Sequence, residues 1–390
     1  MSKVMRALGL MSGTSLDGID VALIDTDGEN HVVRGPSMTF PYGAPMRQLL
    51  VNAIADASQL KDRRDRPANL PHAERELTEH HGAAVSAFLR KQGIKREDID
   101  VIGFHGQTVL HRAPSEELKL TVSGEPYDEP KRGLTVQLGL GEMLADFTRR
   151  PVVYDLRAAD VAAGGQGAPL VPIYHQALTV KLTQRPLAIV NIGGVANVTW
   201  IGREARLLAF DTGPGNALID DWMQKHTGSA LDNGGEAAAR GAVHSDILNA
   251  CLNDPFFAAM PPKSLDRNTF FADLCDGLSV EDGAATLAAI TAGAIAKARE
   301  HMPEEPALWI IAGGGRRNKT IMRLIAERVQ NAVVPAEAVG IDGDSVEAEA
   351  WAYLAVRSMQ GLPITFPGTT GVASPTTGGV LVKPRTYLVN

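Results

Sequence analysis

Aspartates beside glycine-rich stretches are the residues best suited to chemistry in this sequence. Asp160 precedes the run VAAGGQGAPLVP, whose small residues would let the backbone approach a ligand closely. A carboxylate held there can act as a general base, and its neighbours are too small to give it a packing role. Asp155, five residues earlier, is explained equally well as a helix cap or as a partner of Arg157. Asp160 is therefore the stronger candidate for catalysis.

A second candidate is the stretch GLMSGTSLDGID, which spans residues 9–20. Gly13, Thr14 and Ser15 offer backbone N–H groups and hydroxyls to an anion, and Asp17 offers a carboxylate to a metal ion or water. The spacing matches neither a Walker A loop nor a GxGxxG fingerprint. A hairpin turn would explain each residue alone, but not all of them together between two apolar strands. The pattern favours a phosphate-binding loop.

Two further glycine clusters follow short apolar runs, LAIVNI before GGVAN and LWIIA before GGGRRN. A strand that ends in a glycine turn is a recurrent phosphate-binding device in α/β proteins. Gly193, Gly194 and Asn197 could contact phosphates, and the glycines of 313–315 would let a flat adenine lie against the backbone. The latter could also be a tight strand-to-helix turn, and DTGPGN, which contains Asp211, could be a capped helix start. Together the loops predict one nucleotide held at several places.

Other polar residues are less decisive on spacing alone. The segment GFHGQTVLH contains His105, and the late segment SVEAEAWAYLA contains Glu347 and Glu349. A lone histidine after a strand is more often structural than catalytic. Acidic residues in the first turn of a helix are commonly partners of the helix dipole. These residues therefore have no assigned role from their spacing.

The elements that must position these residues follow from hydrophobic patterning. The chain is expected to open with two or three antiparallel strands, with residues 12–17 as the loop between the first pair. Residues 112–133 are polar and charged, which predicts a surface loop or hairpin. Each half begins with strands around a glycine loop, so a domain boundary is expected near 184–186. Apolar spacing predicts helices over 46–60, 73–92, 284–298 and 345–359, and a strand over 99–106.

Composition narrows the class of protein. Of the 390 residues, 44% are hydrophobic and 21% are charged, and the formal net charge is -7. A mildly acidic chain without a basic run is a poor nucleic-acid binder. No run of about 18 apolar residues predicts a membrane span, and no apolar export signal is evident. Cys251 and Cys275 lack metal-site or disulfide-scaffold spacing. These features lead us to expect a globular cytoplasmic protein that binds neither nucleic acid nor membranes.

Six motifs occur in the order found in the anhydro-N-acetylmuramic acid kinase family, which the sequence resembles over essentially its whole length. They are GLMSGTSLDGID, GFHGQT, RAADVAAGGQGAPLVP, NIGGVANVT, DTGPGN and AGGGRRN. The resemblance implies an α/β fold with two ribonuclease-H-like (actin-like ATPase) domains flanking a nucleotide and substrate cleft. The expected domains are residues 1–184 and 185–363, with 364–390 packing back on the cleft or on the first domain.

The resemblance also implies a coupled reaction. These kinases use ATP and water to open the 1,6-anhydro ring of anhydro-N-acetylmuramic acid, a product of cell-wall (peptidoglycan) recycling. The product is N-acetylmuramic acid 6-phosphate. On this pattern Asp160 matches the base that deprotonates the attacking water. The expected cofactors are ATP and Mg²⁺, the expected ligand is a small amino sugar, and relatives suggest a homodimer.

The family's site residues carry over motif by motif. The first phosphate loop would consist of Gly13, Thr14, Ser15, Leu16, Asp17, Gly18, Ile19 and Asp20. The second phosphate loop would use Gly193, Gly194 and Asn197, and the residues facing adenosine would be Gly313, Gly314 and Gly315. The sugar-side residues would be His105, Gly106, Gln107 and Glu347, and the candidates to hold Mg²⁺ through water are Asp17 and Asp211.

The sequence departs from the family pattern in places, and other functions compete. Leu156 stands where the family often has Phe, and SLDRNTF replaces a more typical segment, which leaves a sugar contact by Arg267 open. The main alternative is another sugar or carboxylate kinase of the same superfamily, in which the aspartate would deprotonate the acceptor. An ATP-driven conformational protein would need a polymerisation surface or a client-binding domain. A pure glycosidase does not explain three phosphate-like loops.

Overall fold

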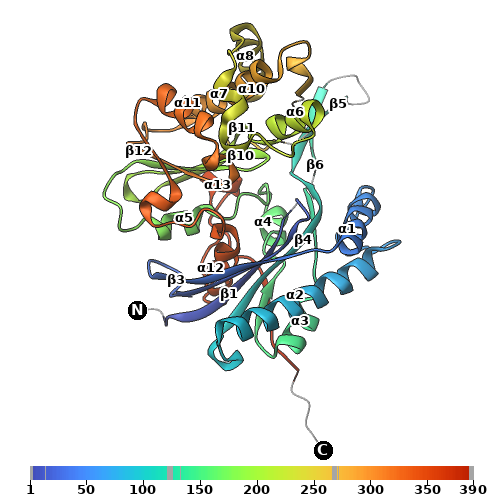
Figure 1. Ribbon diagram of the computed structural model, residues 1–390. Coiled ribbons are helices and arrows are strands. Elements are labelled where there is room, and N and C mark those ends of the chain that lie inside the picture. The colour runs from blue at the N-terminus through green and yellow to red at the C-terminus, as the bar shows by residue number, and fades with distance from the viewer. Residues whose placement is uncertain are drawn as a thin grey trace, which may run out of the picture. The chain divides into compact units, whose positions relative to one another are not determined.

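The computed structural model describes residues 3–13, 15–120, 126–131, 133–265, 270 and 272–385. The chain divides into two compact units, which are described separately. The first consists of Met1–Val180 together with Ser345–Asn390, and the second is Lys181–Asp344. Each unit is built on its own mixed β-sheet (Figure 1).

The sheet of the first unit begins with three antiparallel strands, as the sequence predicts. These are β1 (Met5–Ser12), β2 (Gly18–Thr26) and β3 (Val32–Pro41). On its other side β1 pairs in parallel with β4 (Val101–Arg112), which pairs in parallel with β8 (Val152–Tyr154). The remaining strands are β7 (Leu134–Leu138), antiparallel to β4, and β14 (Val380–Val382), antiparallel to β8. The β1–β2 connection is therefore the predicted glycine loop.

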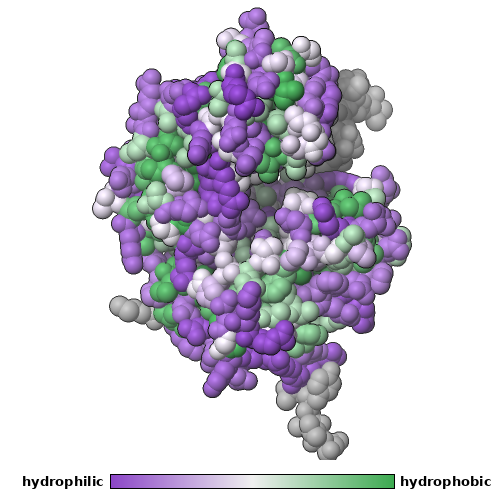
Figure 2. Space-filling model, viewed as in Figure 1, coloured by the Kyte–Doolittle hydropathy of each residue, from purple (hydrophilic) through white to green (hydrophobic). Residues whose placement is uncertain are grey.

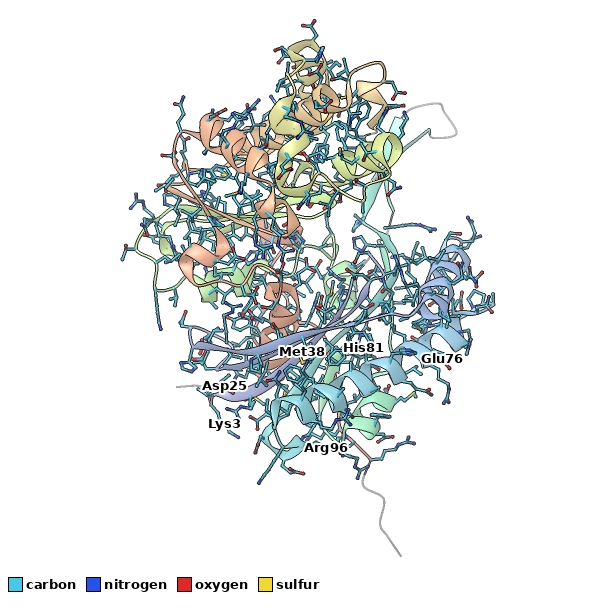
Figure 3. The ribbon with its side chains drawn as sticks, viewed as in Figure 1. Lys3, Asp25, Met38, Glu76, His81 and Arg96 are labelled. Atoms are coloured by element: carbon cyan, nitrogen blue, oxygen red, sulfur yellow. The ribbon has the colours of Figure 1, made fainter. Side chains whose placement is uncertain are left out.

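The two faces of this sheet are covered by different helices. Leu8 and Leu10 of β1 point into an apolar core shared with α1 (Ala44–Ala57) and α2 (Leu70–Gln92). Because side chains alternate along a strand, Gly9 points to the other face, where α12 (Val346–Met359) packs (Figure 1). Figure 3 shows His81 and Met38 between α2 and the strands.

The other elements of the first unit connect these layers. A hairpin of β5 (Ser115–Leu120) and β6 (Pro126–Lys131) confirms the hairpin expected over 112–133. The shorter helices are α3 (Gly141–Thr148), α4 (Ala158–Ala162), α5 (Pro172–Leu178) and α13 (Pro367–Thr370). The predicted helices over 46–60 and 73–92 correspond to α1 and α2, and the ends differ by three residues or fewer.

The second unit repeats the same strand order. Its sheet contains β9 (Leu187–Ile192), β10 (Val195–Ile201), β11 (Leu207–Pro214), β12 (Leu308–Ala312) and β13 (Ala332–Pro335). The strands β9, β10 and β11 are antiparallel, and β12 and β13 continue from β9 in parallel. In each unit the first strand lies between the second and the fourth of its sheet. The expected α/β fold with two ribonuclease-H-like domains is confirmed.

A buried helix organises the core of the second unit. Along α10 (Val280–Lys297) every residue from Gly283 to Ala296 is buried, as expected for the predicted small-residue helix. It packs against the sheet and against neighbouring helices. The other helices are α6 (Ala217–Thr227), α7 (Glu236–Arg240), α8 (Ser245–Leu252), α9 (Pro255–Ala258) and α11 (Lys319–Val329). On the face shown in Figure 2, hydrophilic residues predominate and apolar ones are scattered.

The compact units do not coincide with the predicted segments 1–184, 185–363 and 364–390. The first boundary differs by only four residues, but the second unit ends at Asp344. The reason is α12, whose alanine-rich face packs directly on β1, β2 and β4 of the first sheet. Within the described residues, no helix is both long and apolar enough to cross a membrane.

Candidate functional site

The loop between β1 and β2 exposes polar side chains to solvent and is held to the core by the buried side chain of Leu16. Its turn is closed by a hydrogen bond of 3.2 Å from the Leu16 amide to the Gly13 carbonyl. The Leu16 side chain is buried in the core, whereas Ser15 and Asp17 are exposed and linked by a 2.8 Å hydrogen bond from Ser15 Oγ to Asp17 Oδ1. Thr14 lies outside the described residues. Ser15 and Asp17 are therefore the side chains of this loop that can meet a ligand.

The last three residues of the predicted phosphate loop lie in β2. Gly18 packs so closely against β3 that a Cβ would lie 2.5 Å from the Phe40 carbonyl oxygen. Ile19 is buried in the core, and Asp20 Oδ1 accepts a hydrogen bond from Thr39 Oγ1. These contacts give Gly18 and Ile19 structural roles in pairing and packing. Their proposed contacts with ATP stay predictions.

A buried hydrogen-bond network lies where β1 ends beside β4. Ser12 Oγ donates to Gln107 Oε1 at 2.6 Å, and it lies 2.9 Å from the Tyr42 hydroxyl. Gln107 is fully buried, and burial raises the pKa of Tyr42. The Gln107 side chain thus helps to hold the first loop in place. Its Nε2 donates to the Thr108 carbonyl at 3.3 Å, which uses one of its two N–H groups.

Asp160 lies on the short helix α4 and is 1% exposed. Both carboxylate oxygens are fixed: Oδ1 accepts from Thr370 Oγ1 at 2.6 Å, and Oδ2 accepts from the Gly167 amide at 2.6 Å. The intervening glycines permit this geometry, because a Cβ on Gly165 would lie 2.4 Å from Oδ2. The structure places the candidate base in a rigid, buried cradle. Sequence reasoning missed Thr370, which no local pattern connects to Asp160.

His105 is buried beside the same cradle. Its ring stacks on Trp351 of α12, with 4.3 Å between ring centroids. Burial, reinforced by the charge of Arg157, lowers its pKa well below the ordinary value. His105 is therefore a neutral hydrogen-bonding group and not a cation. Gly106, the next residue, cannot carry a side chain, because a Cβ would lie 2.1 Å from the Leu138 carbonyl oxygen.

The two glutamates of α12 differ completely in environment. Glu347 is exposed, and its charge opposes the lowering of the Arg157 pKa that burial causes. Glu349 is 1% exposed and accepts hydrogen bonds from Arg34 (2.8 Å), Tyr174 (2.7 Å) and Ser345 (2.9 Å). Burial and the neighbouring carboxylate raise the pKa of Tyr174 well above its ordinary value. Glu349 fastens α12 to the rest of the unit, and Glu347 is the one able to meet a ligand.

Asp155 does not share the environment of Asp160. It forms an ion pair with Arg63, and both residues line a cavity of about 320 Å³. His105, Gln137 and Tyr154 also line this cavity. The suggested pairing of Asp155 with Arg157 is therefore not what the structure shows.

In the second unit, the glycine loops after β9 and β12 come together at one edge of the sheet. A Cβ on Gly313 would lie 2.4 Å from Asn191 Oδ1, and a Cβ on Gly315 would lie 2.3 Å from Ile192. The Asn216 amide donates to the Gly193 carbonyl at 2.7 Å. Gly313 and Gly315 therefore have no room for a side chain in this packing. The turns predicted to meet phosphates and adenosine are thus neighbours, with Asn197 and Asp211 paired on the adjoining strands β10 and β11.

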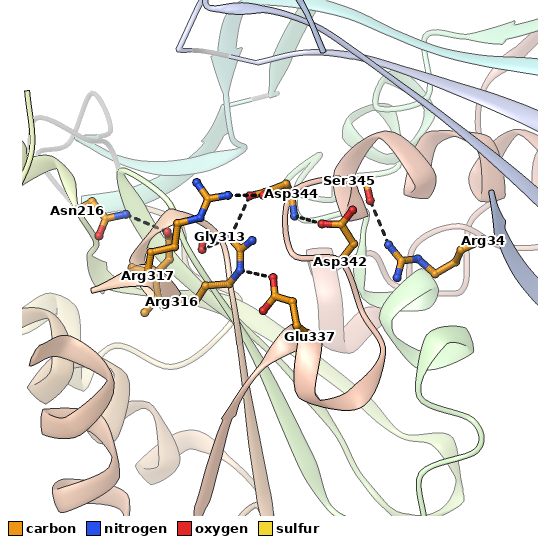
Figure 4. Close-up of polar contacts among 10 residues, drawn as sticks. Arg34, Asn216, Gly313, Arg316, Arg317, Glu337, Asp342, Asp344 and Ser345 are labelled. Carbon is orange, nitrogen blue, oxygen red and sulfur yellow. Dashed lines mark hydrogen bonds and ion pairs between the residues drawn. The ribbon is translucent and has the colours of Figure 1, made fainter. Parts of the chain in front are cut away.

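Arg316 follows these glycines and links their turn to residues near the C-terminal end of the second unit (Figure 4). It donates to the Gly313 carbonyl at 2.8 Å, to Glu337 at 2.7 Å and to Asp344 at 3.0 Å. Its side chain is 6% exposed. Arg316 is therefore a structural support of the glycine turn, which sequence reasoning did not single out. Figure 4 also shows Arg34 bonded to Ser345 in the first unit.

Asp211 of the second unit and Asp17 of the first are the carboxylates that the sequence predicts to hold Mg²⁺ through water. Burial raises the pKa of Asp211 to about 6, and its Oδ2 accepts from the Leu265 amide at 2.8 Å. Among the described residues, no group of three or more His, Cys, Asp or Glu side chains forms a metal cage. Mg²⁺ usually keeps several waters and needs only one or two carboxylates besides substrate phosphates. Single aspartates therefore match its ordinary coordination. Arg267 lies outside the described residues.

The duplicated strand order, with a glycine turn after the first strand of each sheet, defines the class of protein. It is the fold of the actin-like ATPases and sugar kinases. A family model for anhydro-N-acetylmuramic acid kinase matches residues 5–384. The chain therefore belongs to the anhydro-N-acetylmuramic acid kinase family, whose members phosphorylate a sugar hydroxyl.

Curated relatives with this family name align with the chain over their full length. The anhydro-N-acetylmuramic acid kinase of Azorhizobium caulinodans is 54% identical over 386 residues, covering 97% of this chain and 100% of the relative. That of Rhizobium johnstonii is 50% identical over 389 residues, covering 98% and 100%. A solved xylulose kinase from Lactobacillus acidophilus matches with a TM-score of 0.45 and 10% identity, covering 97% of this chain and 94% of that one.

Proposed function

We propose that this chain uses ATP and water to convert 1,6-anhydro-N-acetylmuramic acid into N-acetylmuramic acid 6-phosphate and ADP, a step of peptidoglycan recycling. Family membership over residues 5–384 supports the substrate and the phosphoryl donor. The observation that carries the hydrolytic half is the buried Asp160 carboxylate, whose two oxygens are each held by one donor.

In the proposed reaction, Asp160 takes a proton from a water molecule, whose oxygen attacks the anomeric carbon. The bond from that carbon to O6 breaks, and the released O6 accepts the γ-phosphoryl group of ATP. A carboxylate that accepts only one hydrogen bond on each oxygen keeps lone pairs for a water proton. Rigid placement of the base should increase the rate of the hydrolytic step, because general-base catalysis requires the reacting atoms to be held at close distance.

The nucleotide roles are assigned to the glycine turns. We assign the phosphates to residues 13–20 and to Gly193, Gly194 and Asn197, and adenosine to residues 313–315. Mg²⁺ would be held through water by Asp17 and Asp211, where it would supply positive charge to phosphate oxygens. Exposed Ser15 and Asp17, and the close packing of Gly313 and Gly315, where an added Cβ would clash, support these roles.

The sugar is assigned to His105, Gly106, Gln107 and Glu347. The exposed carboxylate of Glu347 suits hydrogen bonds from sugar hydroxyl and amide groups. His105, Gly106 and Gln107 are assigned by their place in the family motif GFHGQT. We further propose a homodimer that works in the cytoplasm, where ATP is available. Sedimentation equilibrium of the purified chain tests the first part: a single species at the monomer mass contradicts it.

The proposal is tested by incubating the protein with ATP, Mg²⁺ and anhydro-N-acetylmuramic acid in oxygen-18 water and analysing the product by mass spectrometry. We expect a phosphorylated sugar with one heavy oxygen on the anomeric carbon. Unlabelled product kept in oxygen-18 water without protein for the same time corrects for exchange. If the wild type leaves this sugar unchanged and phosphorylates another, the substrate assignment is wrong.

Two matched variants test the role of Asp160. Asp160→Asn should abolish the product while ATP binding, measured by calorimetry, stays intact. Asp155→Asn is the control, because Asp155 pairs with Arg63 on the cavity wall and asparagine tolerates its positive φ of 56°. Equal losses in the two variants would contradict the assignment of Asp160 as the base.

A further inference from the structure

Arg157 lies between the proposed sugar-side residue and the proposed base, and no role has been given to it so far. It follows Leu156, at the start of the turn that leads into α4. Because Asp155 pairs with Arg63, the guanidinium of Arg157 is left to other partners. Within the described residues it makes two side-chain hydrogen bonds, to His105 and to Gly167.

The first hydrogen bond defines the state of His105. Arg157 Nε donates to His105 Nε2 at 3.0 Å, so Nε2 must be unprotonated and act as an acceptor. The other ring nitrogen, Nδ1, lies 2.9 Å from the Gly106 carbonyl oxygen and therefore carries the proton. An arginine has only donors, so this contact selects one of the two neutral tautomers of the histidine.

The second hydrogen bond reaches the base through one peptide unit. Arg157 Nη1 donates to the Gly167 carbonyl at 2.8 Å, and the Gly167 amide donates to Asp160 Oδ2 at 2.6 Å. A turn of glycines has little intrinsic stiffness, so the guanidinium supplies the restraint that the loop lacks. The orientation of the Asp160 carboxylate thus depends on Arg157.

Trp351 of α12 completes the arrangement. The Arg157 guanidinium lies over its ring, 5.0 Å from the centroid, and the His105 ring stacks on it at 4.3 Å. Burial lowers the pKa of Arg157 to about 10, with Glu347 and Asp160 opposing that shift, so the group stays charged near neutral pH. The cation–π contact with Trp351 therefore helps to fix the orientation of the Arg157 guanidinium.

We infer that Arg157 is a positioning residue that fixes both the tautomer of His105 and the direction of the Asp160 carboxylate. The inference rests on the proposed function for its catalytic consequence. The competing explanation is that Arg157 only balances the charges of Asp160 and Glu347. Substitution by lysine distinguishes the two explanations, because lysine keeps the positive charge but cannot donate hydrogen bonds in two fixed directions.

The test compares Arg157→Lys and Arg157→Met with wild type, using Arg323→Lys on the exposed side of α11 as control. Both Arg157 variants should lose about 100-fold in kcat/KM for the sugar, the scale expected when a catalytic group is misplaced by about an ångström. The dissociation constant for ATP should stay within a factor of two. Rescue by lysine to near wild-type activity would overturn the inference, as would unchanged activity in both variants.

A second measurement does not depend on turnover. Nitrogen-15 NMR of the histidine side chains, with His105 identified by its loss in His105→Asn, reports the tautomer directly. Wild type should show an unprotonated Nε2, and both Arg157 variants should show a tautomer mixture. An unchanged spectrum in the variants would contradict the inference even if activity falls. A wild type that fails to phosphorylate the sugar, but shows the expected spectra, would refute the proposed function and keep the positioning role.

Discussion

At the scale of single residues, the Asp160 carboxylate has almost no freedom, because donors meet both oxygens and Gly165 lies against one of them. Sequence reasoning could find Asp160, since a carboxylate beside a glycine run is a local pattern. It could not find Thr370, which is 210 residues further along the chain and follows no recognisable motif. Nor could it find Arg157, whose partners are set by folding.

Gly165→Ala should strongly reduce turnover. The added methyl would lie 2.4 Å from Asp160 Oδ2, so the carboxylate must turn away from its two donors. Gly164→Ala is the matched control: its Cβ would meet nothing within 4 Å, although its φ of +86° makes alanine strained by about 1 kcal/mol. Steady-state kinetics should show a loss of about 100-fold in kcat for the first variant. Comparable losses in both would mean that loop strain, and not the clash, matters.

Thr370→Val should reduce kcat, because it removes the donor to Asp160 Oδ1 and keeps the size of the side chain. Thr370→Ser retains the hydroxyl and should keep most of the activity. Loss of one hydrogen bond to a charged group is worth about 1.5–3 kcal/mol. Kinetics of the two variants at saturating ATP measure the difference. A serine variant as slow as the valine variant would show that the methyl group, not the hydroxyl, is required.

At the scale of elements, α12 lies directly on the backbone of two strands. A Cβ on Gly9 would be 1.7 Å from the Ala348 carbonyl oxygen, and one on Gly103 would be 2.0 Å from that of Trp351. Helical spacing predicted this helix, but it did not indicate which sheet the helix packs on, because periodicity reveals an apolar face and not what covers it. The glycines in GLMSG and VIGFH were therefore interpretable only after folding.

Gly9→Ala should destabilise the protein by about 3 kcal/mol, the upper range for overpacking a core. The helix would have to move away from β1, and with it Trp351 beneath His105. Gly93→Ala is the control: its Cβ would meet nothing within 4 Å at the exposed end of α2, and its φ of +66° adds only about 1 kcal/mol of strain. Urea unfolding followed by circular dichroism measures both. An equal loss of unfolding free energy in the two variants would indicate that α12 can shift to accommodate the added methyl group at little cost.

The buried Glu349 should matter more to stability than its exposed neighbour. Glu349→Gln removes the negative charge from the Arg34–Glu349 ion pair, and breaking a buried ion pair costs about 3 kcal/mol. Glu347→Gln, two residues earlier and exposed, should leave the unfolding midpoint nearly unchanged. Thermal denaturation of both variants provides the comparison. A larger loss for Glu347→Gln would show that the helix is fastened elsewhere.

At the scale of the whole molecule, buried histidines set the acid limit of stability. Burial lowers the pKa of His81, His111 and His175 to about 4. The unfolded chain binds protons near pH 6.5, so the stability that these groups contribute is present above 6.5 and is lost as the pH falls toward 4. For His81 alone the loss between pH 7 and pH 5 is about 2 kcal/mol.

His81→Asn should therefore flatten the acid limb of the stability curve. Asparagine does not titrate, so the change in unfolding free energy between pH 7 and pH 5 should be about 2 kcal/mol smaller than in wild type. His31→Asn, at an exposed position, is the control and should follow the wild-type curve. Denaturant titrations at several pH values test this. Parallel curves for His81→Asn and wild type would contradict it.

The strand order repeated in the two units bears on the evolutionary origin of the chain. In each sheet the first strand runs beside the fourth, so Ser12 lies opposite Gln107 just as Asn191 lies opposite Ala312. The segment after His105 and the turn that begins at Gly313 thus occupy equivalent places in the two sheets. This equivalence is what the duplication of one ancestral unit would leave. Under the proposed function, each copy would have kept a phosphate turn, while only the first gained sugar contacts and only the second gained contacts to adenosine.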